Sequence, residues 1–174
     1  LEPWLGRSAE ADTESARLAL ERGDWARAES LVDSALKLAP EHVAALWLRV
    51  ELHDAAGRSD EAEQLCRRLV ALHNTAKIGE AEPLRWIARA AARCAAANRD
   101  REQFRLLITE FYPEILAREP DFWPAHYDAG RLLLAKHNRG DAAKHLKAAL
   151  EINPYAAEVH VALAELALLD RDID

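Results

Sequence analysis

Histidine and cysteine side chains are the residues of this sequence that could bind a metal ion or attack a substrate. The chain contains seven histidines and two cysteines. No histidine pair has the H-E-x-x-H spacing of a zinc protease, and the cysteines do not form a C-x-x-C motif. Motifs for a nucleophilic serine, for phosphate binding and for paired catalytic carboxylates are missing as well. The sequence therefore predicts no catalytic residue, no metal site and no cofactor.

The overall composition limits the partners that the chain could bind. Its 174 residues carry a formal net charge of −7 at pH 7, which argues against nucleic acid as a partner because nucleic-acid binding needs a basic surface. No apolar run reaches the roughly 18 residues that a membrane-spanning helix needs. Apolar residues make up 50% of the chain but aromatic residues only 6%, and alanine and leucine dominate. This composition is typical of a helical protein.

The elements that must position any functional side chain are helices. Apolar and small residues recur at spacings of three and four along nearly the whole chain, and no stretch alternates strictly. The pattern predicts about nine helices of roughly 12 to 20 residues, joined by short turns that imply antiparallel neighbours. The predicted breaks lie at residues 22–24, 39–41, 56–58, 73–82, 98–100, 119–121, 137–140, 153–154 and 170–172.

Two similar phrases indicate an internal repeat. SALKLAPEH and KAALEINPYA each run from a small residue through leucine to a proline, which is Pro40 in the first phrase and Pro154 in the second. The same repeat length separates Ala28 from Ala62 and Pro120 from Pro154. Three such lengths fit between the two prolines and leave a remainder of about a third of a repeat. The remainder falls between Asn74 and Pro120, so the third unit is expected to be irregular.

A helix–turn–helix unit of about 34 residues resembles the tetratricopeptide repeat. That family has small residues at positions 8, 20 and 27, where helices approach closely, and proline at position 32, where the second helix ends. The residues of this sequence are Ala16, Val50, Gly130 and Ala164 at position 8; Ala28, Ala62 and Ala142 at position 20; Ala35, Leu69 and Ala149 at position 27; and Pro40, Asn74 and Pro154 at position 32. The resemblance implies an all-α fold, a right-handed α-solenoid of stacked helical hairpins.

The resemblance also implies a domain organisation. We expect one repeat domain over residues 1–174, as a fragment of a longer chain. The expected units are 9–42, 43–76, 84–120 with an insertion at 77–83 before it, 123–156, and a terminal helix at 157–170.

The irregular third unit leads to two further expectations. Its second helix should kink or break at Phe111–Tyr112 and leave Pro113 at the start of a short final helix, because proline is tolerated only in the first turn. The insertion at 77–83 has two interpretations, a segment that contacts a specific partner or a tolerated surface loop.

In the resembled family the first helices of the units line a concave groove that holds a peptide or protein. The concave positions here include Trp47, Glu51, Arg85, Arg89, Tyr127, Asp128 and Arg131. Trp47 and Tyr127 are the candidate aromatic anchors, although Trp47 could instead pack on the neighbouring helix. Arg89 and Arg131 could bind a carboxylate of the partner. The predicted partner-binding residues are therefore Trp47, Glu51, Arg89, Tyr127 and Arg131.

The repeat register also assigns roles to the cysteines and to three histidines. Cys66 and Cys94 take apolar positions and should both be buried. His53, His126 and His160 take large positions, so we expect them to serve packing or an interface.

The predicted function is that of a protein–protein interaction scaffold without catalytic activity. The alternative is the repeat region of a larger bacterial multidomain enzyme whose catalytic domain lies outside this chain. RNA binding through the related pentatricopeptide hairpins is disfavoured by the acidic charge and by the repeat length. The apolar helix Val159–Leu169 predicts either that the native chain continues with more repeats or that two copies self-associate.

Overall fold

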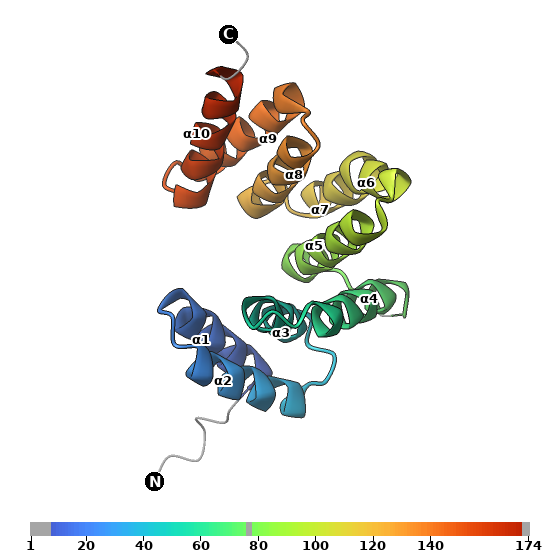
Figure 1. The fold of residues 1–174 in the computed structure, drawn as a ribbon, viewed down its shortest axis with the longest axis vertical. Coiled ribbons are helices and arrows are strands. Elements are labelled where there is room, and N and C mark those ends of the chain that lie inside the picture. The colour runs from blue at the N-terminus through green and yellow to red at the C-terminus, as the bar shows by residue number, and fades with distance from the viewer. Residues whose placement is uncertain (1–7, 76–77, 172–174) are drawn as a thin grey trace.

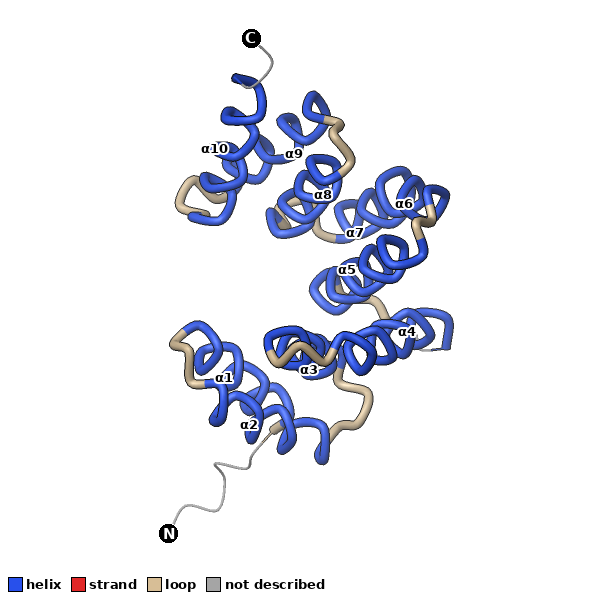
Figure 2. The backbone as a smooth tube through the Cα atoms, viewed as in Figure 1, coloured by secondary structure: helices blue, strands red, loops and turns tan. Residues whose placement is uncertain are grey.

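The computed structural model describes residues 8–75 and 78–171, and every regular element within them is a helix (Figures 1 and 2). Because α6, η1 and α7 follow one another without a gap, the described chain forms nine helical rods, as the sequence predicts. The elements are α1 (Ala9–Glu21), α2 (Trp25–Leu38), α3 (Val43–Ala55), α4 (Ser59–Thr75), α5 (Ala81–Asn98), α6 (Arg101–Leu106), the π-helical segment η1 (Leu107–Phe111), α7 (Tyr112–Arg118), α8 (Trp123–Ala135), α9 (Arg139–Ile152) and α10 (Ala157–Arg171).

Several helices begin at a residue whose side chain caps the first turn. The side chains of Ser8, Asp24, Asp100 and Asn138 each accept a hydrogen bond from the backbone N–H three residues later. The cap satisfies one of the N–H groups that a helix leaves without an intrahelical partner. These caps explain why the helices begin directly after the polar breaks in the sequence.

The turn inside each hairpin contains one residue in the left-handed conformation. Gly23 and Gly57 have φ angles of 74° and 72° and occupy equivalent places in the first and second hairpins. Arg99 and His137 take the same role in the third and fourth hairpins, with φ angles of 53° and 60°. A side chain in this region costs about 1–2 kcal/mol, which glycine avoids.

Small residues allow the helices of a hairpin to touch. Ala16, Ala28 and Ala35 are completely buried between α1, α2 and their neighbours. Gly130 in α8 faces Leu146 in α9, and a Cβ atom at Gly130 would lie 2.8 Å from the Leu146 Cγ atom. The small residues at the repeat positions are therefore required by close packing.

The core runs along the chain and has no single centre. Separate clusters join α1–α3 around Val32, α3–α5 around Leu69, α5 with α7 and α8 around Ile115, and α9 with α10 around Val159. Each hairpin thus packs on its neighbours in sequence, which is the organisation of a solenoid.

The third hairpin departs from the regular pattern in two places. At the expected position the chain stays helical but changes its winding, since the π-helical segment η1 ends at Phe111 and Pro113 lies in the first turn of α7, as the sequence predicts. A wider turn before Pro113 avoids the clash between the proline ring and the preceding turn. In addition, α5 begins at Ala81, so residues 81–83 of the expected insertion form its first turn, and Pro83 is tolerated there.

The helices stack into an arc with one open side (Figure 1). The first helices of the hairpins, α1, α3, α5 and α8, border this side together with α10, and the two ends of the arc face each other across it. None of the described helices is long and apolar enough to cross a membrane.

Candidate functional site

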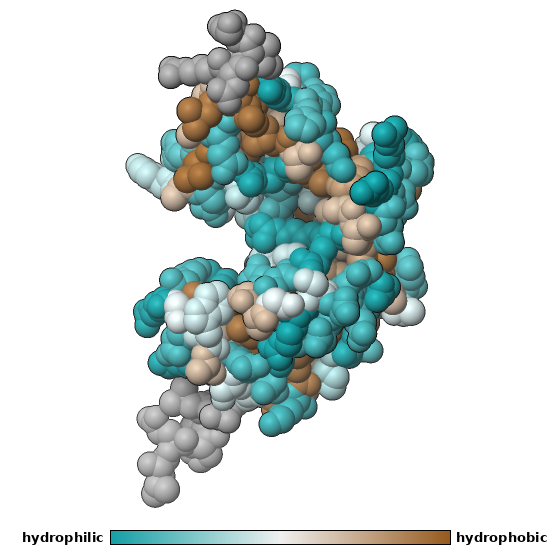
Figure 3. Space-filling view, in the orientation of Figure 1, coloured by the Kyte–Doolittle hydropathy of each residue, from teal (hydrophilic) through white to brown (hydrophobic). Residues whose placement is uncertain are grey.

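The open side of the solenoid contains a cavity of about 640 Å³. Figure 3 shows the hollow on this side and the hydrophilic residues around it. The residues that line the cavity come from α1, α5, α8 and α10: Glu14, Arg17, Glu82, Arg85, Trp86, Arg89, Trp123, Tyr127 and Glu158. Charged and aromatic side chains together therefore line a concave surface, which is a composition typical of binding sites.

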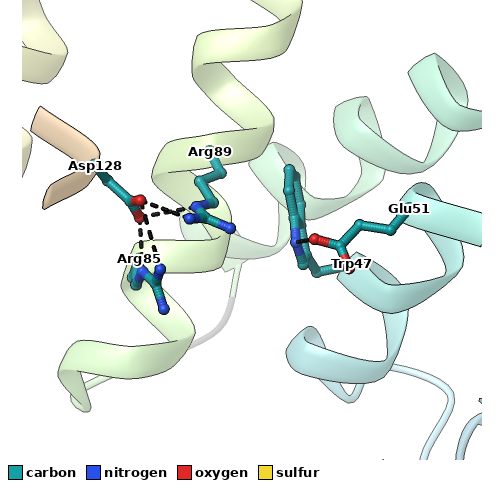
Figure 4. Close-up of polar contacts among 5 residues, drawn as sticks. All are labelled: Trp47, Glu51, Arg85, Arg89 and Asp128. Atoms are coloured by element: carbon teal, nitrogen blue, oxygen red, sulfur yellow. Dashed lines mark hydrogen bonds and ion pairs between the residues drawn. The ribbon is translucent and has the colours of Figure 1, made fainter. Parts of the chain in front are cut away.

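Two tryptophans stack at this cavity, Trp86 in its lining and Trp47 behind it. The rings of Trp47 in α3 and Trp86 in α5 lie 5.8 Å apart at an interplanar angle of 18°. The Trp47 Nε1–H donates a hydrogen bond of 2.8 Å to Glu51 Oε1 (Figure 4). Trp47 is only 9% exposed, so packing against the neighbouring helix takes up nearly its whole surface.

Two arginines of α5 bind one buried carboxylate of α8 (Figure 4). Arg89 donates from Nε to Asp128 Oδ2 at 2.9 Å and from Nη2 to Oδ1 at 2.6 Å. Arg85 donates from Nε to Oδ2 at 2.6 Å. The Asp128 side chain is 4% exposed, so these bonds replace the water that burial removed.

The arginines also lie against the stacked indole rings. The Arg85 guanidinium lies 4.5 Å from the centre of the Trp86 ring, and the Arg89 guanidinium lies 5.1 Å from the same ring and 5.8 Å from the Trp47 ring. These are cation–π distances. The second, third and fourth hairpins are thereby joined by one polar and aromatic network.

Burial and charge shift the pKa values of two residues in this network. Burial raises the pKa of the Glu51 carboxyl, and the hydrogen bond from Trp47 and the charge of Arg89 oppose this effect. Burial works against the charged form of Arg89, but the Asp128 carboxylate outweighs burial and raises the pKa of the guanidinium. Arg89 therefore stays positively charged although it is partly buried.

Comparison with known proteins gives the family. Residues 13–77 and 127–174 match the sequence model of the tetratricopeptide repeat, and these segments make up more than half of the chain. The chain belongs to the tetratricopeptide repeat family. Tetratricopeptide repeat proteins generally mediate protein–protein interactions, and proteins with this fold are typically scaffolds without enzymatic activity. No curated protein sequence matches this tetratricopeptide repeat chain.

Solved structures show the same fold. A thermophilic tetratricopeptide repeat protein of Thermus thermophilus is similar with a TM-score of 0.69 and 21% identity, over 92% of this chain and 81% of that one. PilF of Pseudomonas aeruginosa is similar with a TM-score of 0.57 and 16% identity, over 94% and 69% of the two chains. The Cut9–Hcn1 assembly of the APC/C is similar with a TM-score of 0.58 and 16% identity, over 92% of this chain and 30% of the other.

The structure places the five predicted partner-binding residues in different surroundings. Arg89 and Tyr127 line the cavity of this tetratricopeptide repeat chain. Trp47 and Glu51 lie behind Arg89 and contact the cavity only through the network described above. Arg131 forms an exposed ion pair with Glu165 of α10.

Four residues that shape the site are missing from the predicted set of partner-binding residues. Arg85 and Asp128 stand at concave positions but are not among the five predicted residues, and the repeat pattern does not single out Trp86 or Trp123. A usable signal was present, because Arg85 and Arg89 are four residues apart on one helix face and Asp128 is an acid at a concave position of the next unit.

The burial of the cysteines and of one histidine agrees only in part with the prediction. Cys66 is buried, and burial raises the pKa of its thiol to about 12, whereas Cys94 is only half-buried. The prediction of a buried Cys94 was therefore wrong. His160 is exposed and donates from Nε2 to the Pro154 carbonyl at 2.8 Å, so it does not pack in the core of this chain.

His126 of α8 and His145 of α9 form a pair inside the fourth hairpin. Their Nδ1 atoms lie 3.2 Å apart, and burial lowers the pKa of both rings. Within the part of the chain that the structure describes, no cluster of three or more histidine, cysteine, aspartate or glutamate side chains could hold a metal ion.

Proposed function

We propose that this chain is a scaffold that holds a segment of a partner protein against its concave face, around Arg89 and Tyr127. The observation that carries the proposal is the cavity of about 640 Å³, where Tyr127 and Trp123 of α8 face the arginines of α5. Aromatic and arginine side chains at the centre of a concave surface supply most of the energy in protein interfaces.

The five predicted residues have different roles in this proposal. Tyr127 is half-buried and provides the aromatic contact, and Arg89 presents the rest of its guanidinium next to it. Trp47 and Glu51 hold Arg89 in place from behind. Arg131 and Glu165 form an exposed pair, and such pairs contribute only about 0–1 kcal/mol, so Arg131 can exchange Glu165 for a carboxylate of the partner.

The test is to select peptides from a random display library on the purified chain and to measure their Kd by fluorescence anisotropy. Tyr127→Ala should weaken binding of the selected peptides at least ten-fold. Tyr155→Ala is the matched control, because Tyr155 is 92% exposed in the turn before α10 and does not line the cavity. Equal losses in the two variants would contradict the proposal.

Self-association through α10 is a second proposal. Val159 and Leu166 of this helix are buried against α8 and α9, but Val161 and Leu168 are 58% and 63% exposed. Two copies could cover these side chains on each other. The alternative of a repeat region within a larger bacterial multidomain enzyme remains a prediction, which the sequence of the full-length gene would test.

A further inference from the structure

A second groove, of about 580 Å³, lies between α1, the α2–α3 turn with the first half of α3, and the start of α5 with the residues just before it. Apolar residues line it, among them Val43, Ile78, Pro83 and Trp86. Val43, Ile78 and Pro83 are only half-buried, so apolar surface remains open on the groove side. A segment that covers this surface would remove it from water, which favours binding.

The rim of this groove is acidic. One arginine, Arg17, lines it, but its guanidinium is already bound by Glu14 and Glu21 at 2.8 and 2.7 Å. The glutamates along the groove are Glu10, Glu14, Glu41, Glu80 and Glu82. The negative charge of the groove therefore exceeds the positive charge that the chain itself supplies.

Three of these carboxylates are unpaired within the described residues. Glu41, Glu80 and Glu82 are exposed, and their side chains form neither a hydrogen bond nor an ion pair there. The hydrogen bond to Glu14 is the main cause that raises the pKa of the Arg17 guanidinium, and Glu82 is nevertheless near enough for its charge to raise that pKa as well. Glu80 precedes the first turn of α5 without capping it through its side chain. Carboxylates of like charge on one groove repel one another, and a bound cation relieves this repulsion.

Trp86, in the lining of this groove, carries a hydrogen-bond donor without an acceptor. The Trp86 side chain is 8% exposed and lines the groove, and its Nε1–H has no partner in the described structure. A buried donor without an acceptor is destabilising. Because this nitrogen is itself buried, an acceptor on a bound segment would reach it only if the Trp86 ring shifted.

We infer that this groove binds a basic segment of the partner, in which lysine or arginine residues stand beside apolar ones. The long stems of lysine and arginine cover apolar surface while their charged heads reach the carboxylates at the rim. The inference rests on the proposed function, because this groove and the cavity around Arg89 and Tyr127 share four residues and form one continuous surface. The shared residues are Glu14, Arg17, Glu82 and Trp86.

The charge of the partner is tested with two synthetic peptides. One is a fluorescein-labelled decapeptide of alternating lysine and leucine, and the other replaces each lysine with glutamate. The variant Glu41→Gln, Glu80→Gln, Glu82→Gln removes the three unpaired carboxylates. The control Glu61→Gln, Glu119→Gln, Glu151→Gln changes three exposed glutamates that do not line either groove, so both triple variants have a net charge of −4 in place of −7.

We expect the basic peptide to bind at least ten-fold more tightly than the acidic one. The groove variant should lose at least ten-fold in affinity, and the control variant less than two-fold. Equal losses in the two variants would show that the overall charge attracts the peptide, and that result would overturn the inference. Tight binding of the acidic peptide, or of neither peptide, would overturn it too.

Failure of this inference is distinguishable from failure of the proposed function. If library peptides bind and respond to Tyr127→Ala but carry no excess of lysine and arginine, the proposed function stands and the inference is wrong. If no library peptide responds to Tyr127→Ala, the proposed function itself is wrong.

Discussion

The Arg89 guanidinium holds the buried Asp128 carboxylate with two hydrogen bonds, 2.9 Å from Nε to Oδ2 and 2.6 Å from Nη2 to Oδ1. This pair joins α5 to α8, which are separated in sequence by α6, η1 and α7, the second half of the irregular hairpin. The relationship gives Arg89 a structural role in addition to its proposed role in binding. An arginine chosen as a ligand for a partner's carboxylate is thus already bound to a carboxylate of its own chain.

Replacing Asp128 with asparagine should destabilise the chain by about 3 kcal/mol, because it leaves two partly buried guanidinium groups without a counter-charge. Urea unfolding followed by circular dichroism measures the change. Asp54→Asn is the control, since Asp54 also binds an arginine of α5, Arg93, but both side chains are about one-third exposed. The control should cost less than about 1 kcal/mol. Equal losses of stability in the two variants would contradict the claim that the buried ion pair stabilises the chain more than the exposed one.

Adding one methyl group at Gly130 should destabilise the fourth hairpin. The new Cβ atom would lie 2.8 Å from Leu146 Cγ, and Leu146 is completely buried. Overpacking of this kind costs about 1–3 kcal/mol, which exceeds the gain of up to about 1 kcal/mol in helix propensity. Thermal unfolding should show a lower Tm for Gly130→Ala.

Gly140→Ala is the matched control for this change. Gly140 lies in α9, and a Cβ atom there would meet nothing within 4 Å. The same substitution should therefore raise the stability by about 0.4–1 kcal/mol. An unchanged or higher Tm for Gly130→Ala would show that α8 and α9 are less closely packed than the structure indicates.

The stability of the chain should fall in mildly acidic solution because of His126 and His145. Burial lowers the pKa of both rings below the ordinary value of 6.5, so the unfolded chain binds protons at a higher pH than the folded chain does. The stability that the two neutral histidines contribute to the folded chain is therefore present above pH 6.5, and it is lost as the pH falls below that value.

The measurement compares the free energy of unfolding at pH 7.5 and pH 5.5 in the native chain and in the double variant His126→Gln, His145→Gln. The native chain should lose more stability than the variant between these two values. Since the carboxylates titrate in both proteins, their contribution cancels in the comparison. A loss of equal size in both proteins would rule out this histidine pair as its source.

Self-association should depend on the exposed side of α10. If two copies pair through this helix, light scattering should find a dimer that Leu168→Asp converts to a monomer, because Leu168 is 63% exposed. Leu38→Asp in α2 is the control, since Leu38 is 54% exposed far along the chain from α10. Leu163 of α10 is left unchanged in this test. It packs against two core clusters, so a charge there would also destabilise the fold. A monomeric native chain at high concentration would contradict the proposal.

The fold could be predicted from the sequence because its signals are local and periodic. The repeat spacing, the polar residues before the helices and Pro113 each determined a feature that the structure contains. The start of α5 was harder to predict, because proline is tolerated in a first turn and Pro83 therefore did not mark the helix boundary.

The binding surface could be predicted only as a set of positions. A repeat register places Trp47, Arg89 and Asp128 on the concave side of the solenoid. It does not determine which of these side chains bind one another. Ring stacking between Trp47 and Trp86 and the pairing of Arg89 with Asp128 depend on side-chain contacts between units. The sequence places opposite charges at concave positions of neighbouring units, but which side chains meet depends on three-dimensional packing, which the repeat period does not determine.

The most direct measurement of where a partner binds is photo-crosslinking from Tyr127, which lines the cavity, and from Tyr155, which does not. The photoreactive residue p-benzoylphenylalanine is placed at position 127 in one protein and at position 155 in another, and each is irradiated with a library-selected peptide. Binding on the concave face predicts a crosslink from position 127 and none from position 155. A crosslink from position 155 alone would contradict it.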